Sequence, residues 1–402
     1  MLVWYALAAG LIRIADGCVG VAVVVLALQR TNSPAAAGLV VSAYTLPALA
    51  SGPLLGAWLD RTHQRKLALV GNQLILATSM LGLVATLGRA PLPVCLAIVA
   101  AAGVTLPLTS AGFTSMIPSL VAPARLPRAN TMDAVSFNGA ALLGPAVAGT
   151  IAAASSPTWA TVVTAIIAFA AVPPTLMLRT PARDGVAAGA SLWATVVAGT
   201  RVMVRTPPLR AGTLVTVISM LAQGMFAIGF PLFALRLGAR AEAGGAFWAA
   251  LELGALLGAF AATWIMARIS PERVIMYGTA VLGLAIATWP LAGSLPVAVV
   301  LIGIGGVVSG PLLVATFAMR QLYTPGNLLA QVSTAGASLK IGAYALGASA
   351  GGWLIPTAGA RWGLGVVAGL HLVAALAGYL AGRSRVSTMA ELADVEVMPQ
   401  AT

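Results

Sequence analysis

The chain alternates between long apolar runs and short polar connections. A helix needs about 20 consecutive apolar residues to cross the hydrocarbon core of a bilayer. Barrel strands need only about 9–11 residues, so these runs are too long for them. The pattern predicts an all-α polytopic membrane protein with twelve transmembrane helices, at Trp4–Leu28, Ala35–Trp58, Leu67–Leu87, Leu92–Ile117, Asn130–Ala154, Thr158–Leu178, Leu209–Leu235, Gly245–Met266, Val274–Ala292, Pro296–Met319, Leu328–Ile355 and Trp362–Ala381.

The composition agrees with this pattern. Hydrophobic residues make up 59% of the 402 residues and charged residues only 8%, whereas about a quarter of a soluble domain is charged. Too few charged side chains exist to cover a surface that faces water, and the chain is too apolar to be disordered. We therefore expect a multi-pass protein of a cell membrane, with the lipid bilayer as a partner.

The basic residues are distributed unevenly between the two sides of this arrangement. With a cytoplasmic N-terminus, fifteen of the 22 Lys and Arg residues fall in inner connections and ends, five in outer loops, and Arg13 and Lys340 within spans. The positive-inside rule then places both termini in the cytoplasm. The net charge of +12 forms no clustered basic patch with interleaved aromatics, so we expect no nucleic-acid partner.

The sequence repeats itself at an offset of about half its length. Three stretches recur in order at offsets of 202, 207 and 203 residues: Gly52-Pro-Leu-Leu-Gly56-Ala57 as Gly254-Ala-Leu-Leu-Gly258-Ala259, Ala15-Asp16-Gly17 as Ala222-Gln223-Gly224, and Gly139, Gly144 and Gly149 as Gly342, Gly347 and Gly352. Such repeats are typical of secondary transporters, whose binding site lies between the repeats near the midplane. The expected units are two pseudo-symmetric six-helix bundles, residues 1–178 and 209–381, a cytoplasmic linker 179–208 with an amphipathic helix at Ser191–Arg205, and a cytoplasmic tail 382–402.

The connection after the second span carries a recognisable motif. It reads Gly56-Ala-Trp-Leu-Asp60-Arg61-Thr-His-Gln-Arg65-Lys66, with Asp-Arg four residues after the glycine and a basic pair at its end. In this position it resembles the signature of the major facilitator superfamily, although His63 stands near the place of a usual second glycine. The resemblance implies the major facilitator fold and a conformational latch, formed by Gly56, Asp60, Arg61, Arg65 and Lys66, that holds the outward-facing state. The alternative is that these charges only set the topology.

The fifth span carries a second motif, a glycine and proline run from Asn138 to Gly149. Its Gly139, Gly144, Pro145 and Gly149 resemble the pattern in the bacterial drug/proton antiporters of the same superfamily. The resemblance implies export from a bacterial inner membrane rather than uptake. Pro145 removes one backbone hydrogen bond and is expected to kink the helix, while the glycines allow close packing. Packing alone is the alternative explanation.

Ionisable residues inside spans are costly and therefore mark functional positions. Asp16 lies in the middle of the first span and is the first candidate for proton coupling, with Arg13 three residues earlier on the same face. The equivalent position in the second half is Gln223, so only one half carries the ionisable group. A permanent Arg13–Asp16 ion pair with a purely structural role is the alternative.

Two further carboxylates complete the coupling candidates. Asp133, near the inner end of the fifth span, is expected at the inner gate with Arg61 or Arg128, or alternatively at the lipid interface. Glu252 in the eighth span is a second proton or cation site. Lys340 either attracts an anionic group of the substrate or neutralises a carboxylate. Polar and aromatic residues that share helix faces predict the substrate cavity: Tyr44, Ser51, Gln223, Phe226, Phe230, Trp248, Lys340 and Tyr344.

These observations predict a secondary active transporter that exports amphipathic, cationic small molecules in exchange for protons, by alternating access. Two alternatives remain: a carrier of a specific metabolite, siderophore or lipid with an anionic group, and an intramembrane hydrolase with Ser349 and His371. A phosphate-binding Gly-x-x-x-x-Gly-Lys-Ser/Thr loop is missing from the sequence, which disfavours an ATP-driven pump, whereas a channel stays open. We expect no enzyme activity, catalytic residues, cofactor or metal. The expected partners are a small-molecule substrate, protons and lipid, and the expected state is a monomer.

Overall fold

The first half of the chain is helical wherever the structure describes it. The computed structural model describes residues 2–62, 64–122, 126–178, 192–325 and 328–382. Its first half contains α1 (Leu2–Thr31), α2 (Pro34–Thr45), α3 (Pro47–Arg61), α4 (Arg65–Thr86), α5 (Leu92–Pro107), the π-helical segment η1 (Leu108–Gly112), α6 (Ile117–Leu120), α7 (Leu126–Ala154), α8 (Pro157–Ala170) and α9 (Val172–Leu176).

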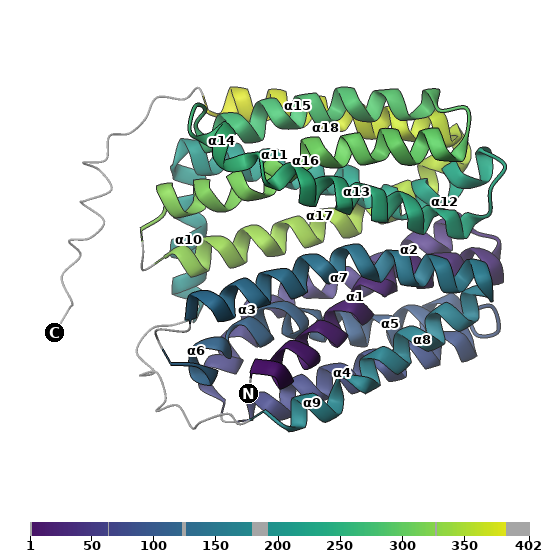
Figure 1. The fold of residues 1–402 in the computed structure, drawn as a ribbon, viewed down its shortest axis with the longest axis horizontal. Coiled ribbons are helices and arrows are strands. Elements are labelled where there is room, and N and C mark those ends of the chain that lie inside the picture. The colour runs from purple at the N-terminus through teal and green to yellow at the C-terminus, as the bar shows by residue number, and fades with distance from the viewer. Residues whose placement is uncertain (1, 63, 123–125, 179–191, 326–327, 383–402) are drawn as a thin grey trace.

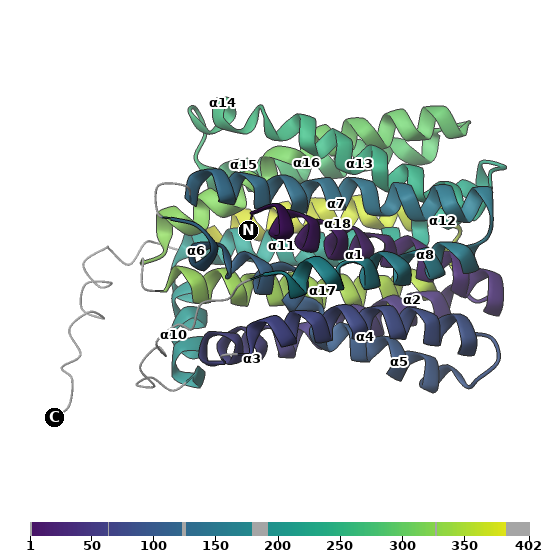
Figure 2. The same ribbon diagram turned by 60° about the horizontal axis from the view of Figure 1, so that its bottom comes forward.

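The second half follows the same plan. It contains α10 (Leu192–Arg205), α11 (Pro207–Gly224), α12 (Phe226–Arg236), the 3-10 turn η3 (Ala241–Ala243), α13 (Gly244–Ala259), α14 (Ala262–Met266), α15 (Pro271–Thr288), the 3-10 turn η4 (Trp289–Leu291), α16 (Leu295–Tyr323), α17 (Leu329–Ala358) and α18 (Ala360–Gly382). Helix α10 matches the helix expected at Ser191–Arg205, except that residue 191 lies outside the described residues. In Figures 1 and 2 it runs across the other helices at one end.

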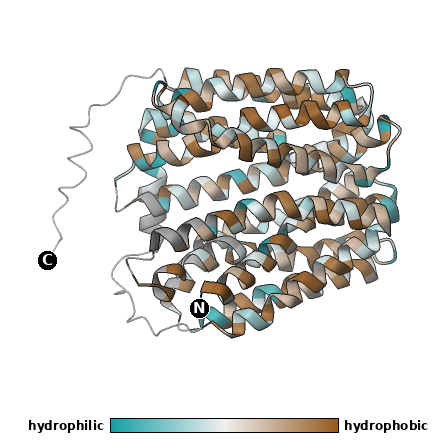
Figure 3. Ribbon diagram, viewed as in Figure 1, coloured by the Kyte–Doolittle hydropathy of each residue, from teal (hydrophilic) through white to brown (hydrophobic). Residues whose placement is uncertain are grey.

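Every predicted apolar run coincides with helical structure, so the predicted fold class is confirmed. Among the described residues, eight helices are long and apolar enough to cross a bilayer, and the pair α11 and α12, bent by 42°, would make a ninth. The other predicted spans are shorter, interrupted or more polar. Figure 3 shows apolar residues along all the long helices, as a chain surrounded by lipid requires.

Prolines mark several of the interruptions, which the predicted continuous runs did not contain. The second span is divided between α2 and α3 at Leu46, directly before Pro47, and the sixth at Ala171, before Pro173 and Pro174. A proline has no backbone N–H to donate to the carbonyl four residues earlier, and its ring crowds that carbonyl, so the helical hydrogen bonding is interrupted there. Leu46 and Ala171 themselves keep helical dihedral angles. The fourth span changes to a π-helical segment after Pro107.

The helices form two groups. In Figure 1, α1 to α9 lie in the lower part and α11 to α18 in the upper part. Within the first group α1 packs on α7 and α8, and within the second α11 packs on α17 and α18. Two seams join the groups: α2 and α3 pack on α17, and α7 packs on α13.

Equivalent glycines make equivalent contacts within the two groups. Gly17 of α1 lies against Gly144 of α7, where a methyl group added to Gly17 would be only 2.7 Å from the Ala140 carbonyl oxygen. Gly224 of α11 lies in the same way against Gly347 of α17. The sequence offsets of 207 and 203 residues relate one pair to the other. The repeat in the sequence thus corresponds to a repeated close approach of two helix backbones.

The two seams between the groups are related by the same offsets. Gly38 of α2 meets Gly352 of α17, and Gly149 of α7 meets Gly245 of α13. A methyl group on Gly245 would lie 2.9 Å from the Gly149 Cα, and one on Gly352 would lie 2.7 Å from the Pro34 carbonyl oxygen. Backbone therefore meets backbone at one glycine crossing on each seam.

Candidate functional site

A cavity of about 270 Å³ lies where the two groups of helices meet. It is walled by α1, α2, α5 and α7 of the first half and by α13 and α17 of the second. The lining residues are Asp16, Gly17, Val19, Gly20, Val21, Val23, Val41, Tyr44, Thr45, Leu106, Ala141, Pro145, Trp248, Glu252 and Tyr344. The surface is mostly apolar, with a few polar groups that could orient a ligand, as in most small-molecule sites.

Asp16 provides the polar group of the first half in this cavity. The Tyr44 hydroxyl donates a hydrogen bond to its Oδ1 atom. The adjacent Gly17 brings α7 close to α1 at this level, so Asp16 faces the cavity beside a tight helix contact. A carboxylate in such a position can accept a proton or bind a cation.

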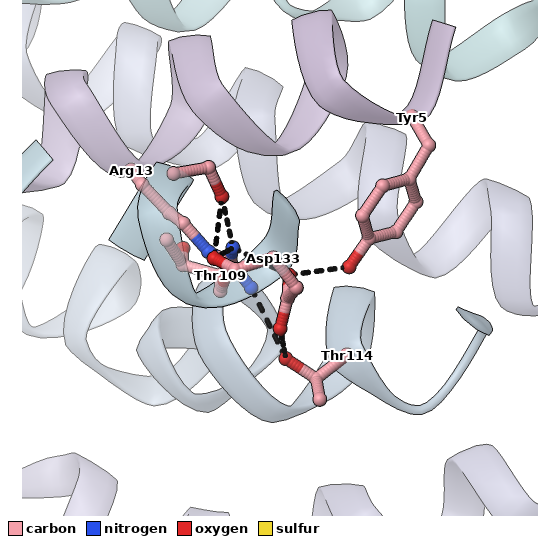
Figure 4. Close-up of polar contacts among 6 residues, drawn as sticks. Tyr5, Arg13, Thr109, Thr114 and Asp133 are labelled. Carbon is pink, nitrogen blue, oxygen red and sulfur yellow. Dashed lines mark hydrogen bonds and ion pairs between the residues drawn. The ribbon is translucent and has the colours of Figure 1, made fainter. Parts of the chain in front are cut away.

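Arg13, which was expected beside Asp16, instead forms an ion pair with Asp133 of α7 (Figure 4). The distance from Arg13 Nη1 to Asp133 Oδ1 is 2.6 Å, and the two residues are 3% and 8% exposed. The Tyr5 hydroxyl donates to the same Oδ1 atom at 2.6 Å, and the Thr114 hydroxyl donates to Oδ2 at 2.7 Å. Arg13 also donates to Ser136 Oγ at 2.6 Å and to the Thr109 carbonyl oxygen at 3.4 Å.

The alternative of a permanent Arg13–Asp16 ion pair is therefore wrong, and the reason is geometric. Three residues apart on one helix face, the two side chains could meet, but Arg13 points to α7 and Asp16 points to α2. The alternative partners proposed for Asp133, the side chains of Arg61 and Arg128, lie outside the described residues. Among the described residues, Asp16 has no cationic partner.

Glu252 and Trp248 supply the second half's side of the cavity. They lie one turn apart on α13 and both line the cavity, facing the helices that carry Asp16 and Tyr44. In the described part of the chain Glu252 forms no hydrogen bond or ion pair. One carboxylate from each half thus lines the same cavity.

An aromatic cluster supports Trp248 from behind. Its ring meets Phe230 edge-on at 5.1 Å and Phe226 at 6.2 Å between centroids, and these two rings stack at 4.7 Å. Phe226 and Phe230 are fully buried and are not among the lining residues. Their predicted place in the cavity wall is corrected to the packing layer behind it, next to Trp289.

The other predicted cavity residues divide into two sets. Tyr44 and Tyr344 line the cavity, as expected. Ser51, Gln223 and Lys340 are not among its lining residues. Ser51 is buried on α3, and its hydroxyl has no hydrogen-bond partner among the described residues. The position of Gln223 on α11 corresponds to that of Asp16 on α1, but the cavity reaches only Asp16.

The predicted latch is described only in part. The side chains of Asp60 and Arg61, and the surroundings of Gly56, lie outside the described residues, so the latch stays a prediction. Arg65 Nε donates to the Leu59 carbonyl oxygen at 2.7 Å, and Lys66 Nζ approaches that of Leu176 at 3.4 Å. The basic pair thereby links the start of α4 to the ends of α3 and α9.

The span-five glycines have separate surroundings. Gly144 packs on α1 and Gly149 on α13, whereas a methyl group added to Gly139 would meet no atom within 4 Å. Helix α7 continues through Pro145, which lines the cavity. The motif therefore contributes to helix packing in the first half, to a seam between the halves and to the cavity wall.

The residues of the hydrolase alternative have other contacts. Ser349 Oγ lies 2.7 Å from Ser42 Oγ across the α2–α17 seam. His371 is fully buried, with Nδ1 2.8 Å from the Val367 carbonyl oxygen of its own helix. Among the described hydrogen bonds, none joins these two side chains.

Sequence reasoning missed two groups of polar residues. Tyr5 lies two turns before Arg13 on the same face of α1, and this spacing could have linked the two. Thr114 and Thr109 join the network only through tertiary packing, which helix periodicity does not reveal. Arg320 was counted among the inner connections because the predicted tenth span ends at Met319, whereas α16 continues to Tyr323 and Arg320 is buried on it.

Comparison with known sequences gives a family-level match. The sequence model described as "Major Facilitator Superfamily" matches residues 5–295. The chain is 28% identical over 358 residues to the uncharacterized MFS-type transporter y4rN of Sinorhizobium fredii (strain NBRC 101917 / NGR234), and the alignment covers 87% of each chain.

Solved structures match over nearly the whole length. A bacterial homolog of the human lysosomal transporter Spinster, in an inward-facing and unoccupied conformation, has a TM-score of 0.73 at 16% identity and covers 95% and 96% of the two chains. The nucleoside transporter NupG has a TM-score of 0.77 at 13% identity, with 94% and 99% covered. A POT family transporter in complex with 5-aminolevulinic acid has a TM-score of 0.73 at 14% identity, with 94% and 95% covered. At these identities the structures establish the fold alone.

Proposed function

The chain belongs to the major facilitator superfamily, a family of transporters, and from this premise we propose that it exports amphipathic, cationic small molecules in exchange for protons. One observation carries the proposal. Two carboxylates, Asp16 from the first half and Glu252 from the second, line one largely apolar cavity, and neither has a cationic partner among the described residues. An organic cation satisfies both features of that cavity.

The lining residues can divide the recognition between them. The two carboxylates attract the positive charge of the cargo, and the Trp248 ring offers a face for a cation or an edge for an aromatic group. Tyr44 donates a hydrogen bond to Asp16 and holds its carboxylate in position. The apolar wall formed by Val19, Val23 and Leu106 contacts the apolar part of the cargo and requires no directional hydrogen bonds.

Proton exchange follows from competition for one carboxylate. A proton on Asp16 removes the negative charge that retains the cargo, so a proton and the cargo exclude each other at this site. We assign Asp16 as the exchange site and Glu252 as the second cationic contact. Arg13 and Asp133 neutralise each other, so in this proposal they act as a structural anchor between α1 and α7.

Alternation would expose the cavity to each side in turn. The proposed motion is a rocking of residues 1–178 against 209–381 about the cavity, with the seams at Gly38–Gly352 and Gly149–Gly245 parting in the opposite state. We place the protein in a bacterial inner membrane as a monomer, with both termini and the α10 linker in the cytoplasm. The span-two latch would then favour the outward-facing state.

The experiment that tests the proposal measures internal pH in proteoliposomes when amphipathic cations are added. Wild type is compared with Asp16→Asn, Glu252→Gln and the control Glu272→Gln, which changes a carboxylate at the start of α15 instead. We expect substrate-triggered proton movement in wild type and the control, and none in Asp16→Asn. Proton movement that survives in Asp16→Asn would move the exchange site to Glu252. Wild type that moves no protons with any cation would contradict the proposal.

A further inference from the structure

A second group of charged side chains lies between α16 and α17, outside the cavity lining. Arg320 is on the last turns of α16 and is 3% exposed. Its Nη1 atom donates to the Ser333 carbonyl oxygen at 3.4 Å. Its Nε and Nη2 atoms are buried and have no hydrogen-bond partner in the described part of the chain. A buried guanidinium with two unused donors is unfavourable unless something accepts from them.

Gly336 of α17 makes room for this guanidinium. A methyl group at Gly336 would lie 2.9 Å from Arg320 Cζ and closer still to Nη2. The guanidinium therefore packs directly against the backbone of α17, in a place that a larger side chain at position 336 would occupy.

Thr324 adds a third unpartnered group, directly after the end of α16. It follows Arg320 by four residues and is the extended residue that caps the helix. Thr324 is 8% exposed, and its hydroxyl is buried without a hydrogen-bond partner among the described residues. Arg320 can only donate and Thr324 can donate, so an oxygen acceptor with several lone pairs would satisfy either group.

Lys340 continues the positive charge along α17. It lies one turn after Gly336 on the same face, and Tyr344, one turn further, lines the central cavity. Lys340 has neither an ion pair nor a hydrogen bond among the described contacts. Because the Arg320 guanidinium contacts Gly336, the two like charges lie one turn apart along α17, and the described contacts give neither a carboxylate partner.

We propose that Arg320 and Lys340 form an oxyanion-binding site that takes a carboxylate or phosphate group of the cargo. The inference deepens the proposed function and rests on it for the identity of the cargo, which would carry an acidic group as well as a basic one. Along α17, one to two helical turns separate this site from the cavity, so the two groups of the cargo would lie about 5–11 Å apart.

The first experiment tests anion binding alone and does not depend on transport. The purified protein is unfolded thermally in detergent with acetate, sulfate or phosphate, each against chloride at equal ionic strength. The variants are Arg320→Gln, Arg320→Lys and Lys340→Gln, with Arg268→Gln as the control because Arg268 is exposed and stacks on Trp264.

We expect at least one oxyanion to raise the unfolding midpoint of wild type and of Arg268→Gln. The increase should be absent in Arg320→Gln and Lys340→Gln and reduced in Arg320→Lys, which keeps the charge but loses the planar fork. An increase that persists in both neutral variants, or that no oxyanion produces in wild type, would overturn the site. If Arg320→Gln does not fold, Lys340→Gln decides.

The second experiment asks whether the anion belongs to the cargo. Binding of an amphipathic amine is compared with that of its analogue bearing a carboxylate about 5–11 Å away, a spacing of one to two helical turns. We expect Lys340→Gln to weaken binding of the zwitterion roughly 10- to 100-fold and to leave the amine unchanged. If the oxyanion effect is present but the carboxylate adds nothing, the site binds free anions and its assignment to the cargo fails. If neither compound binds, the proposed function fails while the first experiment still stands.

Discussion

Arg13 of α1 and Asp133 of α7 form a buried ion pair, with 2.6 Å between Nη1 and Oδ1. Both residues have further hydrogen bonds, from Tyr5 and Thr114 to the carboxylate and from the guanidinium to Ser136. Most polar atoms of the two side chains therefore have partners. Arg13, the cation nearest to Asp16 in the sequence, is engaged by Asp133 and does not neutralise Asp16. The Asp16 carboxylate accepts a hydrogen bond from Tyr44 and is otherwise available to a ligand in the cavity.

Breaking this pair from one side should destabilise the fold. Asp133→Asn leaves a buried guanidinium without its counter-charge, which typically costs about 3–5 kcal/mol of the free energy of unfolding. The double variant Arg13→Gln/Asp133→Asn should lose less than the sum of the single losses. Chemical unfolding in detergent of the four proteins of this cycle measures the coupling. Strictly additive losses would show that the pair contributes no coupling energy.

Glu252 should contribute to ligand affinity through its charge rather than through the shape of its side chain. Because Glu252→Gln keeps the size of the side chain and removes its charge, we expect the affinity for a cationic amphiphile to fall by about tenfold or more and that for its neutral isostere to stay unchanged. Titration calorimetry with the matched pair of compounds measures both. An equal loss for the two compounds would indicate a packing role for Glu252.

Substitutions of Trp248 and Phe230 should have different effects, the first mainly on ligand binding and the second mainly on the stability of the fold. Trp248 lines the cavity, so Trp248→Ala should weaken binding of aromatic cargo with a modest change in stability. Phe230 lies behind it and is fully buried, so Phe230→Ala should cost about 3–5 kcal/mol of the free energy of unfolding. Ligand titration and thermal unfolding of both variants check the division. The reverse pattern would place Phe230 in the cavity wall.

The α2–α17 seam can be locked chemically. Ser42 Oγ and Ser349 Oγ are 2.7 Å apart, across two helices that belong to different halves. Cysteines at both positions should form a disulfide under mild oxidation, since their side chains are already in contact. Transport should stop on oxidation and return on reduction, with Ser42→Cys alone unaffected. Transport that continues in the fully cross-linked protein would mean that this seam does not need to open.

Glycine at the second seam should be essential for closing it. Gly245→Leu places a branched side chain where a methyl group would already lie 2.9 Å from the Gly149 Cα. We expect this variant to disfavour the closed arrangement and to slow the Ser42–Ser349 cross-link when the two changes are combined. Gly139→Leu is the control, because Gly139 has open space around it. Equal cross-linking rates in the two backgrounds would show that the seams close independently.

Periodicity and repeats predicted much of this architecture. Apolar runs located the helices, because a single segment in lipid can satisfy its own backbone groups only as a helix, and the glycine offsets pointed to helix crossings that the structure contains. Neither signal could assign partners between helices. Arg13 shares a face with Asp16, yet the position of α7 decides its pairing, and Phe226 and Phe230 share a face that could equally have lined a cavity or a core. The breaks at Leu46 and Ala171 follow from the prolines after them, which hydropathy alone does not weigh.

The glycine crossings at Gly38–Gly352 and Gly149–Gly245 have a mechanical consequence. A gate plugged by large side chains has to change rotamers one after another before it opens. Here two smooth backbone surfaces meet at both crossings, and the bonds of Ser42 are the directional contacts described on the α2–α17 seam. In the proposed rocking motion the halves would part as rigid bodies, and the same short stretches of backbone would set both the tightness of the seal and the ease of its release.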